Sequence, residues 1–360
     1  MTQKEYIFSN AGLIKSVERS AEHPYAVKEV DTIDVGKPTL VLFGGEYTYV
    51  PQSANHYIKQ MKSVLEISDI NIADIDIYSV YYEFGSRHAD VERTELFRAA
   101  GRKIKEQGHK NAIQFRHEKS QLMKQNEPTP KYIEKLYLSI IQPLIVSSDG
   151  VLLDKKTITD NLKKLRMYGY SHGAAAIYML GQYAQNELKR LGFKAAEIHQ
   201  MLQNVIVIQF GPVSPLEHPA FKTLSFMSGA DTRVDGFNKF SEYMYDNAEN
   251  LYPAYFNQLG THLFIAGKLS ERFDSEHNDD GLLNERNLTE DGKLIFNAER
   301  YAINNAVRSA IESSTPDIKT LVSGPGVDFD EMKSNGEIFY DRMVSRLRAQ
   351  KQNLKSDYQK

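Results

Sequence analysis

Short apolar segments alternate along the chain with longer segments of helical periodicity. Stretches that are apolar on both faces are typical of parallel strands buried inside a sheet. The alternation therefore predicts an α/β fold, with a mainly parallel central sheet flanked by helices. The expected strands are residues 39–43, 72–82, 165–168, 205–210, 223–227 and 263–266, and the expected helices include residues 131–141, 174–190, 195–202 and 297–313.

One connection is too long for a simple link between strands. About eighty residues separate the strand that ends near residue 82 from the strand that begins at residue 165, whereas a strand–helix connection needs far fewer. We expect a helical insertion or lid at residues 86–130 within a single domain of residues 1–360. Residues 328–360 read as a C-terminal helix and tail.

The expected insertion is basic. Residues 86–125 hold ten Lys or Arg and five Asp or Glu, a local excess of five positive charges. Such runs are usually solvated helix faces. The other interpretation is a positive surface beside an active site, which would attract an anionic substrate or an anionic membrane surface.

Overall composition narrows the class of protein. The chain has 360 residues, 41% hydrophobic residues, a net charge of −3 and no cysteine, which allows a large core and excludes disulfides and cysteine-based catalysis. No apolar stretch is long enough to cross a bilayer, the N-terminus lacks the apolar centre of a signal peptide, and the charge does not favour nucleic acid. We expect a soluble, cytoplasmic protein; export without an N-terminal signal and the oligomeric state stay open.

The main candidate for chemistry is Ser171, in the pentapeptide Gly169-Tyr170-Ser171-His172-Gly173. An apolar strand precedes it and an alanine-rich helix follows it. A G-x-S-x-G turn between a strand and a helix exposes a nucleophilic serine, and its glycines leave room for the strained backbone. The alternative interpretation is a glycine-rich turn capped by serine.

A serine nucleophile needs an imidazole to accept its proton and a carboxylate to orient the imidazole. The chain offers these in the order Ser, Asp, His, and with the turn around Ser171 this order resembles the α/β-hydrolase family of esterases and lipases. In that family the acid follows the next-to-last core strand. The resemblance places Asp231 at this position, since it follows the strand 223–227 and precedes Val234; Asp235 is the nearest substitute, and an ordinary turn aspartate is the alternative.

Only two histidines follow Asp231. His277 lies in a polar loop ten residues beyond Gly267, where the resemblance places the base after the last strand. His262 opens the apolar run 263–266, so we expect it at the start of that strand, at the edge of the sheet away from catalysis. His277 is the predicted base, and His262 is the alternative.

Acyl transfer also needs N–H groups that stabilise an oxyanion. The resemblance points to the N–H of His172, directly after the nucleophile, and to an N–H after the strand 39–43. Family members often carry His-Gly at the second place, and here the chain reads Phe43-Gly44-Gly45-Glu46. The choice between the N–H groups of Gly45 and Glu46 therefore stays open.

No cofactor is expected. The acidic residues of the loop 274–280 offer oxygen ligands, but their spacing lacks the pattern of a calcium loop, and no zinc-ligand pair occurs, so no metal is expected either.

Together these features predict a serine hydrolase that cleaves a carboxylic ester or thioester of a small molecule or lipid through an acyl-enzyme. An acyltransferase with the same triad and a catalytically inactive, hydrolase-like binding module are the alternatives. Aromatic residues near the strand ends are candidates for an acyl pocket or for plain core: Tyr47, Tyr49, Tyr81, Tyr82 and Phe84.

Overall fold

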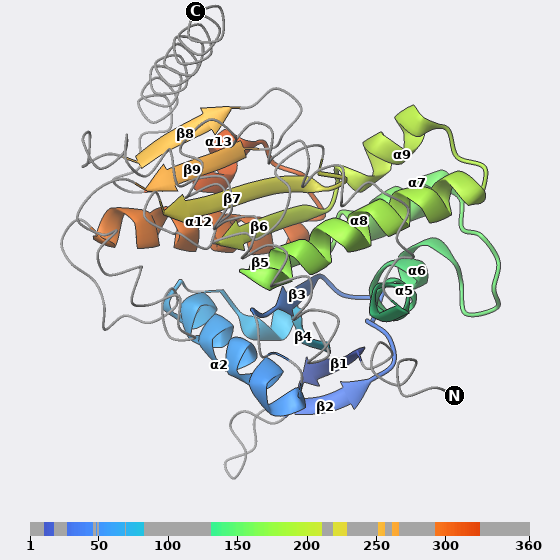
Figure 1. Ribbon diagram of the computed structural model, residues 1–360, viewed down its shortest axis with the longest axis horizontal. Helices are drawn as coiled ribbons and strands as arrows, with labels where there is room; N and C mark the ends of the chain where they lie inside the picture. The colour runs from blue at the N-terminus through green and yellow to red at the C-terminus, as the bar shows by residue number, and fades with distance from the viewer. Residues whose placement is uncertain are drawn as a thin grey trace, which may run out of the picture.

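A computed structural model of the chain shows the arrangement in Figure 1. The structure describes residues 11–17, 27–45, 48, 50–68, 70–82, 131–210, 219–228, 251–255, 261–265 and 292–324. The expected insertion at 86–130 and the expected C-terminal helix and tail at 328–360 lie outside these residues.

The described strands form one nine-stranded sheet in the order β2-β1-β4-β3-β5-β6-β7-β9-β8. Neighbours from β4 through β9 in this order run parallel. The flanking pairs β1–β4, β1–β2 and β8–β9 are antiparallel. The strands are β1 (Ala11–Ser16), β2 (Val27–Val30), β3 (Thr39–Phe43), β4 (Asp76–Tyr82), β5 (Leu165–Tyr170), β6 (Ile206–Phe210), β7 (Lys222–Ser228), β8 (Leu251–Tyr255) and β9 (Thr261–Ile265).

Helices cover both faces of this sheet. The helices α2 (Pro51–Ile67), α12 (Gly292–Ile311) and α13 (Ile318–Val322) share one buried apolar cluster with one face. The other face shares a second apolar cluster with a further series of helices. That series consists of α5 (Lys131–Leu136), a π-helical segment η3 (Tyr137–Ile141), α6 (Gln142–Ile145), α7 (Lys155–Leu162), α8 (His172–Arg190) and α9 (Ala195–Leu202), while a short 3-10 turn η1 (Ile72–Asp74) precedes β4.

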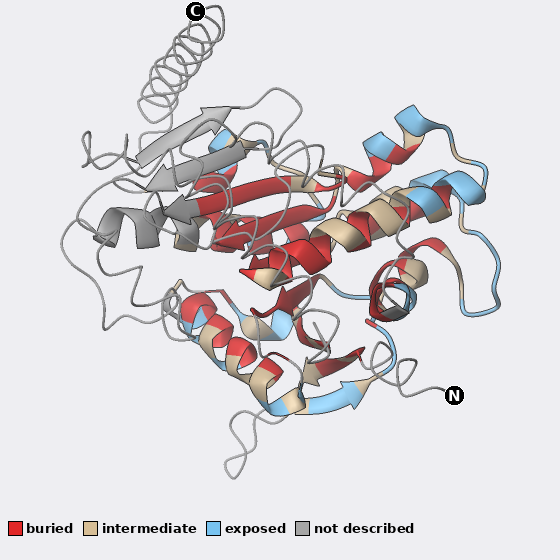
Figure 2. Ribbon diagram, in the orientation of Figure 1, coloured by how far each residue is buried: buried red, intermediate tan, exposed pale blue. Residues whose placement is uncertain are grey.

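The strand β3 shows why the apolar runs form the middle layer. Leu40 and Leu42 belong to the cluster on the α2 side, and Val41 and Phe43 belong to the cluster on the α8 side. All five residues of β3 are buried, because successive side chains point to opposite faces and helices cover both. Figure 2 shows the same burial along the neighbouring central strands.

The predicted mainly parallel sheet with helices on both faces is confirmed, and each of the six predicted strands overlaps an observed one. The strand predicted at residues 72–82 begins later than expected, because residues 72–74 form η1 ahead of β4. The antiparallel strands β1, β2 and β8 were not predicted. They lie towards the edges of the sheet, where one side of a strand can face water and the apolar run is interrupted.

Arg166 joins the sheet to helix α12. Its side chain is buried in β5, with 1% of the residue exposed. The guanidinium donates to the backbone oxygen of Ala306 at 2.8 Å, to Oγ of Ser309 at 2.9 Å and to the backbone oxygen of Ser314 at 2.8 Å. Burial lowers the pKa of Arg166 to about 9. The contacts attach α12 to the centre of the sheet.

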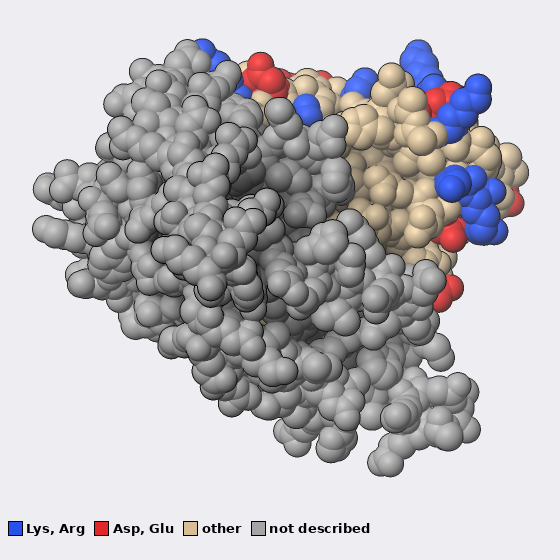
Figure 3. All heavy atoms as spheres, turned by 45° about the horizontal axis from the view of Figure 1, so that its top comes forward, with Lys and Arg blue, Asp and Glu red and all other residues tan. Residues whose placement is uncertain are grey.

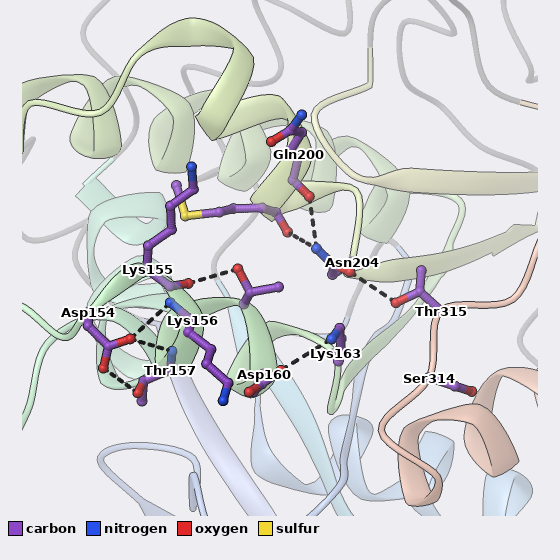
Figure 4. A network of polar contacts seen from close by, with 12 residues as sticks. Asp154, Lys155, Lys156, Thr157, Asp160, Lys163, Gln200, Asn204, Ser314 and Thr315 are labelled. Atoms are coloured by element: carbon purple, nitrogen blue, oxygen red, sulfur yellow. Dashed lines mark hydrogen bonds and ion pairs between the residues drawn. The ribbon is translucent and has the colours of Figure 1, made fainter.

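Polar contacts also join the connections at the amino ends of β5 and β6, as Figure 4 shows. Asp154 caps α7 by accepting from the N–H groups of Lys156 and Thr157, both at 3.0 Å. Asn204 accepts a hydrogen bond from Thr315 at 3.1 Å. The first two bonds cap a helix, and the third joins the turn before β6 to the segment after α12.

Some charged side chains on the helices near this edge form ion pairs. Lys155 lies 2.9 Å from Glu197, and Arg190 lies 2.7 Å from Glu187. Figure 3 shows the described Lys and Arg among Asp and Glu on the face in view. Exposed pairs of this kind contribute little to stability. Among the described residues, no helix is both long and apolar enough to pass through a bilayer.

Candidate active site at the Ser171 turn

Ser171 lies at the bend between β5 and α8. Its backbone has φ of 52° and ψ of −117°, a region that residues with a side chain rarely adopt. Its N–H continues the ladder of the sheet by donating to the backbone oxygen of Phe210 at 3.0 Å. The predicted strand, sharp turn and helix around a strained serine are therefore confirmed. Ser171 is only 3% exposed, so the exposed serine that the motif predicts is not observed.

The two glycines of the pentapeptide are required by close packing. A Cβ on Gly173 would lie 2.1 Å from the backbone oxygen of Phe43, which cannot rotate away. A Cβ on Gly169 would lie 2.8 Å from Cδ1 of Ile177 and 3.1 Å from the backbone nitrogen of Ala174, a tight but milder approach. Small residues thus allow α8 to begin directly against the ends of β3 and β5.

The loop after β3 lies beside the serine. A Cβ on Gly45 would lie 3.4 Å from Cβ of Ser171 and 3.0 Å from Cδ1 of Tyr170. The predicted neighbourhood of Gly45 and the nucleophile is thus observed. Glu46, the other candidate oxyanion donor of this loop, lies outside the described residues.

One peptide group of this loop is held at both ends. Tyr82, at the end of β4, donates its hydroxyl to the backbone oxygen of Gly44 at 2.7 Å. The next N–H, that of Gly45, donates to the hydroxyl of Tyr57 on α2 at 3.0 Å. The backbone oxygen of Gly45 accepts from the N–H of Thr48 at 3.3 Å and from its hydroxyl at 2.8 Å. The N–H of Gly45 therefore already has an acceptor, which makes Gly45 a weaker candidate for the oxyanion donor.

Sequence reasoning did not assign Tyr57 or Thr48 to the site, and it placed Tyr82 among candidates for an acyl pocket or core. Tyr82 is 1% exposed and part of the core. Burial raises the pKa of Tyr82 well above its ordinary value, so its hydroxyl stays protonated and can donate to Gly44. Tyr81 points elsewhere, because its hydroxyl donates to Glu29 on β2. Tyr47, Tyr49 and Phe84 lie outside the described residues.

His172 is the first residue of α8. N–H groups in the first turn of a helix have no acceptor within the helix, and the helix dipole places partial positive charge there. The N–H of His172 directly follows the serine, and it stays a candidate for the oxyanion donor.

The remaining triad candidates, Asp231 and His277, lie outside the described residues, as does Asp235. The strands that precede them are described. β7 ends at Ser228 and β9 ends at Ile265, and both run parallel to β5 through β6. The chain therefore leaves β7 and β9 at the same edge of the sheet as Ser171.

The position of His262 differs in part from the expectation. It lies at the start of β9, as predicted. In the sheet, however, His262 pairs with Ser225 of β7, Ser225 pairs with Gln209 of β6, and Gln209 pairs with Gly169 of β5. Because β9 starts late, His262 is level with Gly169 near the end of β5, and the predicted far edge is wrong. What separates His262 from Gly169 is three strand spacings, roughly 14 Å.

No three His, Asp or Glu side chains within the described ranges gather into a group that could hold a metal ion. The acidic loop 274–280 lies outside them. A scan of the chain against protein-family models and a search among curated proteins both return no match. Function is accordingly inferred from the fold and from the turn at Ser171.

Proposed function

We propose that the protein is a serine hydrolase of α/β-hydrolase type, which cleaves a carboxylic ester or thioester with Ser171 as the nucleophile. The strained backbone of Ser171, at the carboxyl edge of a parallel sheet and directly before a helix, carries the proposal. Such strain costs roughly 1–3 kcal/mol and clusters at active sites. The side chain of Ser171 makes no capping hydrogen bond to α8, so a capping role does not account for the strain.

The proposed reaction has two halves. Oγ of Ser171 bonds to the substrate carbonyl carbon while its proton passes to the imidazole of His277, and Asp231 stabilises the charged ring. The tetrahedral adduct then loses its alcohol or thiol, which takes that proton, and leaves an acyl-serine. Water repeats the sequence: it gives a proton to His277 and bonds to the carbonyl carbon, and the proton returns to Oγ as the acid is released.

The lengths of chain after the strands are compatible with these roles. β7 lies two strand spacings from β5, roughly 10 Å, and β9 lies three, roughly 14 Å. Asp231 follows Ser228 by three residues and His277 follows Ile265 by twelve, and extended segments of these lengths span up to roughly 10 Å and 40 Å. His262 is held within β9 and lacks this freedom, which favours His277 as the base.

The oxyanion donors are proposed as the N–H of His172 and the N–H of Glu46. The N–H of Gly45 is the weaker candidate, because it already donates to Tyr57. A donor fixed in advance contributes about 2.7–4 kcal/mol to transition-state stabilisation. The expected insertion at 86–130 and the compartment of the protein stay predictions from the sequence.

The test begins with a fluorophosphonate probe, which reacts with activated serines. We expect labelling of the wild type and none of Ser171→Ala. Hydrolysis of p-nitrophenyl esters of increasing chain length should follow the same pattern, and added acceptor alcohols would reveal acyl transfer. A folded wild type that neither labels nor turns over any ester would refute the proposal.

Two variants test which histidine is the base. His277→Ala should abolish ester turnover, whereas His262→Ala should retain most of it, because a base must reach the hydroxyl of Ser171 within hydrogen-bond distance. The opposite pattern would move the base to His262 and leave the nucleophile unchanged.

A further inference from the structure

We propose that Tyr57 is a positioning residue of this active site, and that its hydroxyl sets the orientation of the loop that faces Ser171. The inference rests on the proposed function. It assigns a role to a side chain on α2 that the triad and the oxyanion donors do not include.

The Gly44–Gly45 peptide group is the point of contact. Its oxygen accepts from Tyr82 at 2.7 Å and its N–H donates to Tyr57 at 3.0 Å. Since a peptide group is planar, two hydroxyls on opposite ends leave it one orientation. Glycines have no side chain to fix them and are conformationally permissive, so the order of this loop depends on such outside contacts.

Tyr57 touches both the loop and the serine turn. A Cβ on Gly44 would lie 2.2 Å from Cε2 of Tyr57, so the ring fits directly against that glycine. The ring also lies 6.4 Å, centre to centre, from the ring of Tyr170, the residue before Ser171. Tyr57 is 6% exposed. The ring is thus buried beside both segments whose relative position the proposed chemistry requires.

A fixed orientation of the Gly44–Gly45 peptide group would stabilise the transition state. Hydrogen-bond donors aimed in advance at a developing oxyanion need no reorganisation during the reaction, and a shift of about 1 Å can cost about 100-fold in rate. Loss of the Tyr57 hydroxyl would release one end of the peptide group while the ring remained. The expected effect is therefore on kcat, with little change in KM.

The experiment compares Tyr57→Phe with Tyr81→Phe, whose hydroxyl contacts Glu29 away from the loop. With a p-nitrophenyl ester, Tyr57→Phe should lower kcat about 10-fold or more and leave KM within about twofold. The Ki of a trifluoromethyl ketone, which forms a tetrahedral adduct with the serine, should rise by the same factor as kcat/KM falls. Tyr81→Phe should resemble the wild type.

A general loss of stability would lower the free energy of unfolding, which urea unfolding of each variant measures. Rates are measured under conditions in which each variant is folded. If Tyr57→Phe does not fold, Tyr57→Met, which also lacks the hydroxyl that accepts from Gly45, is judged by the same kcat and Ki. A folded Tyr57 variant with unchanged kcat and Ki, or with only KM raised, overturns the role of Tyr57. A wild type that fails to label with fluorophosphonate overturns the proposed function instead.

Discussion

Gly173 faces the backbone oxygen of Phe43 so closely that a Cβ would lie 2.1 Å from it. This contact joins the first turn of α8 to the last residue of β3, and it brings the serine turn against the loop that contains Gly45. No rotation of a side chain could relieve a clash between a methyl group and a carbonyl oxygen in the sheet. The space at Gly173 is therefore a requirement of the fold as well as of the site.

Replacement of Gly173 by alanine should accordingly destabilise the protein. We expect Gly173→Ala to lower the free energy of unfolding by about 1–3 kcal/mol, the usual cost of overpacking, or more. Urea denaturation measures the change. Gly36→Ala is the control, since its Cβ would approach only Oδ1 of Asp34, 3.1 Å away on an exposed side chain. Equal stability of the two variants would contradict the contact.

The strain at Ser171 predicts a gain in stability on its removal. Glycine adopts φ of 52° and ψ of −117° without a steric penalty, so Ser171→Gly should recover most of the roughly 1–3 kcal/mol of strain, less about 0.5–1 kcal/mol for the more flexible unfolded chain. The variant should melt at a higher temperature and be inactive.

Ser313 supplies a matched control, because it also has φ of 52° but lies just after α12. Ser313→Gly should leave ester turnover unchanged. A lower melting temperature for Ser171→Gly than for the wild type would show that the serine is not strained.

The buried guanidinium of Arg166 predicts a large effect at a site far from chemistry. Arg166→Met would remove the donor to the backbone oxygen of Ser314 and to Oγ of Ser309, while the backbone oxygen of Ala306 would keep its bond from Ser309. Hydrogen bonds to a charged group contribute about 1.5–3 kcal/mol. We expect a loss of about 3 kcal/mol in urea unfolding. Arg308→Met on the same helix removes one exposed bond to Ser68 and should cost less than about 1 kcal/mol. Similar losses for both variants would contradict the attachment of α12 through Arg166.

The stability of the protein should fall at alkaline pH. Burial, with a contribution from Glu187, raises the pKa of Tyr137 to about 12. Between pH 10 and 12 the unfolded chain therefore loses this proton before the folded chain does, and the free energy of unfolding decreases as pH rises. The contribution is fully present below pH 10. Tyr137→Phe should reduce the slope of urea-unfolding free energy against pH in this window; an unchanged slope would count against the raised pKa.

The turn at Ser171 could be predicted because its determinants are adjacent in the chain. An apolar strand, two glycines and a run of alanines within residues 165–180 specify strand, bend and helix locally. The surrounding support could not be predicted. Tyr57 is 12 residues from Gly45, and Tyr82 is 38 residues from Gly44, and nothing in either tyrosine's neighbourhood marks its hydroxyl for this loop.

The position of His262 in the sheet also could not be predicted from the sequence. The sequence predicts a strand beginning near this residue, and β9 is observed there. The position of His262 along the strand direction follows from the pairing of β9 with β7, which sets Ser225 opposite His262. Register depends on which strands become neighbours, so the position of a residue within its own strand does not reveal which edge of the sheet it occupies.

The amino-acid sequence by itself determined the alternation of strands and helices, the burial of the central strands on both faces and the bend at Ser171, because each depends on the order of apolar, small and polar residues over a few turns of chain. Only the tertiary structure decided the order of strands, the attachment of α12 through Arg166 and the pair of tyrosine hydroxyls on the Gly44–Gly45 peptide. Hydrogen bonds are short and directional, so their partners exist only once distant segments have packed in one register.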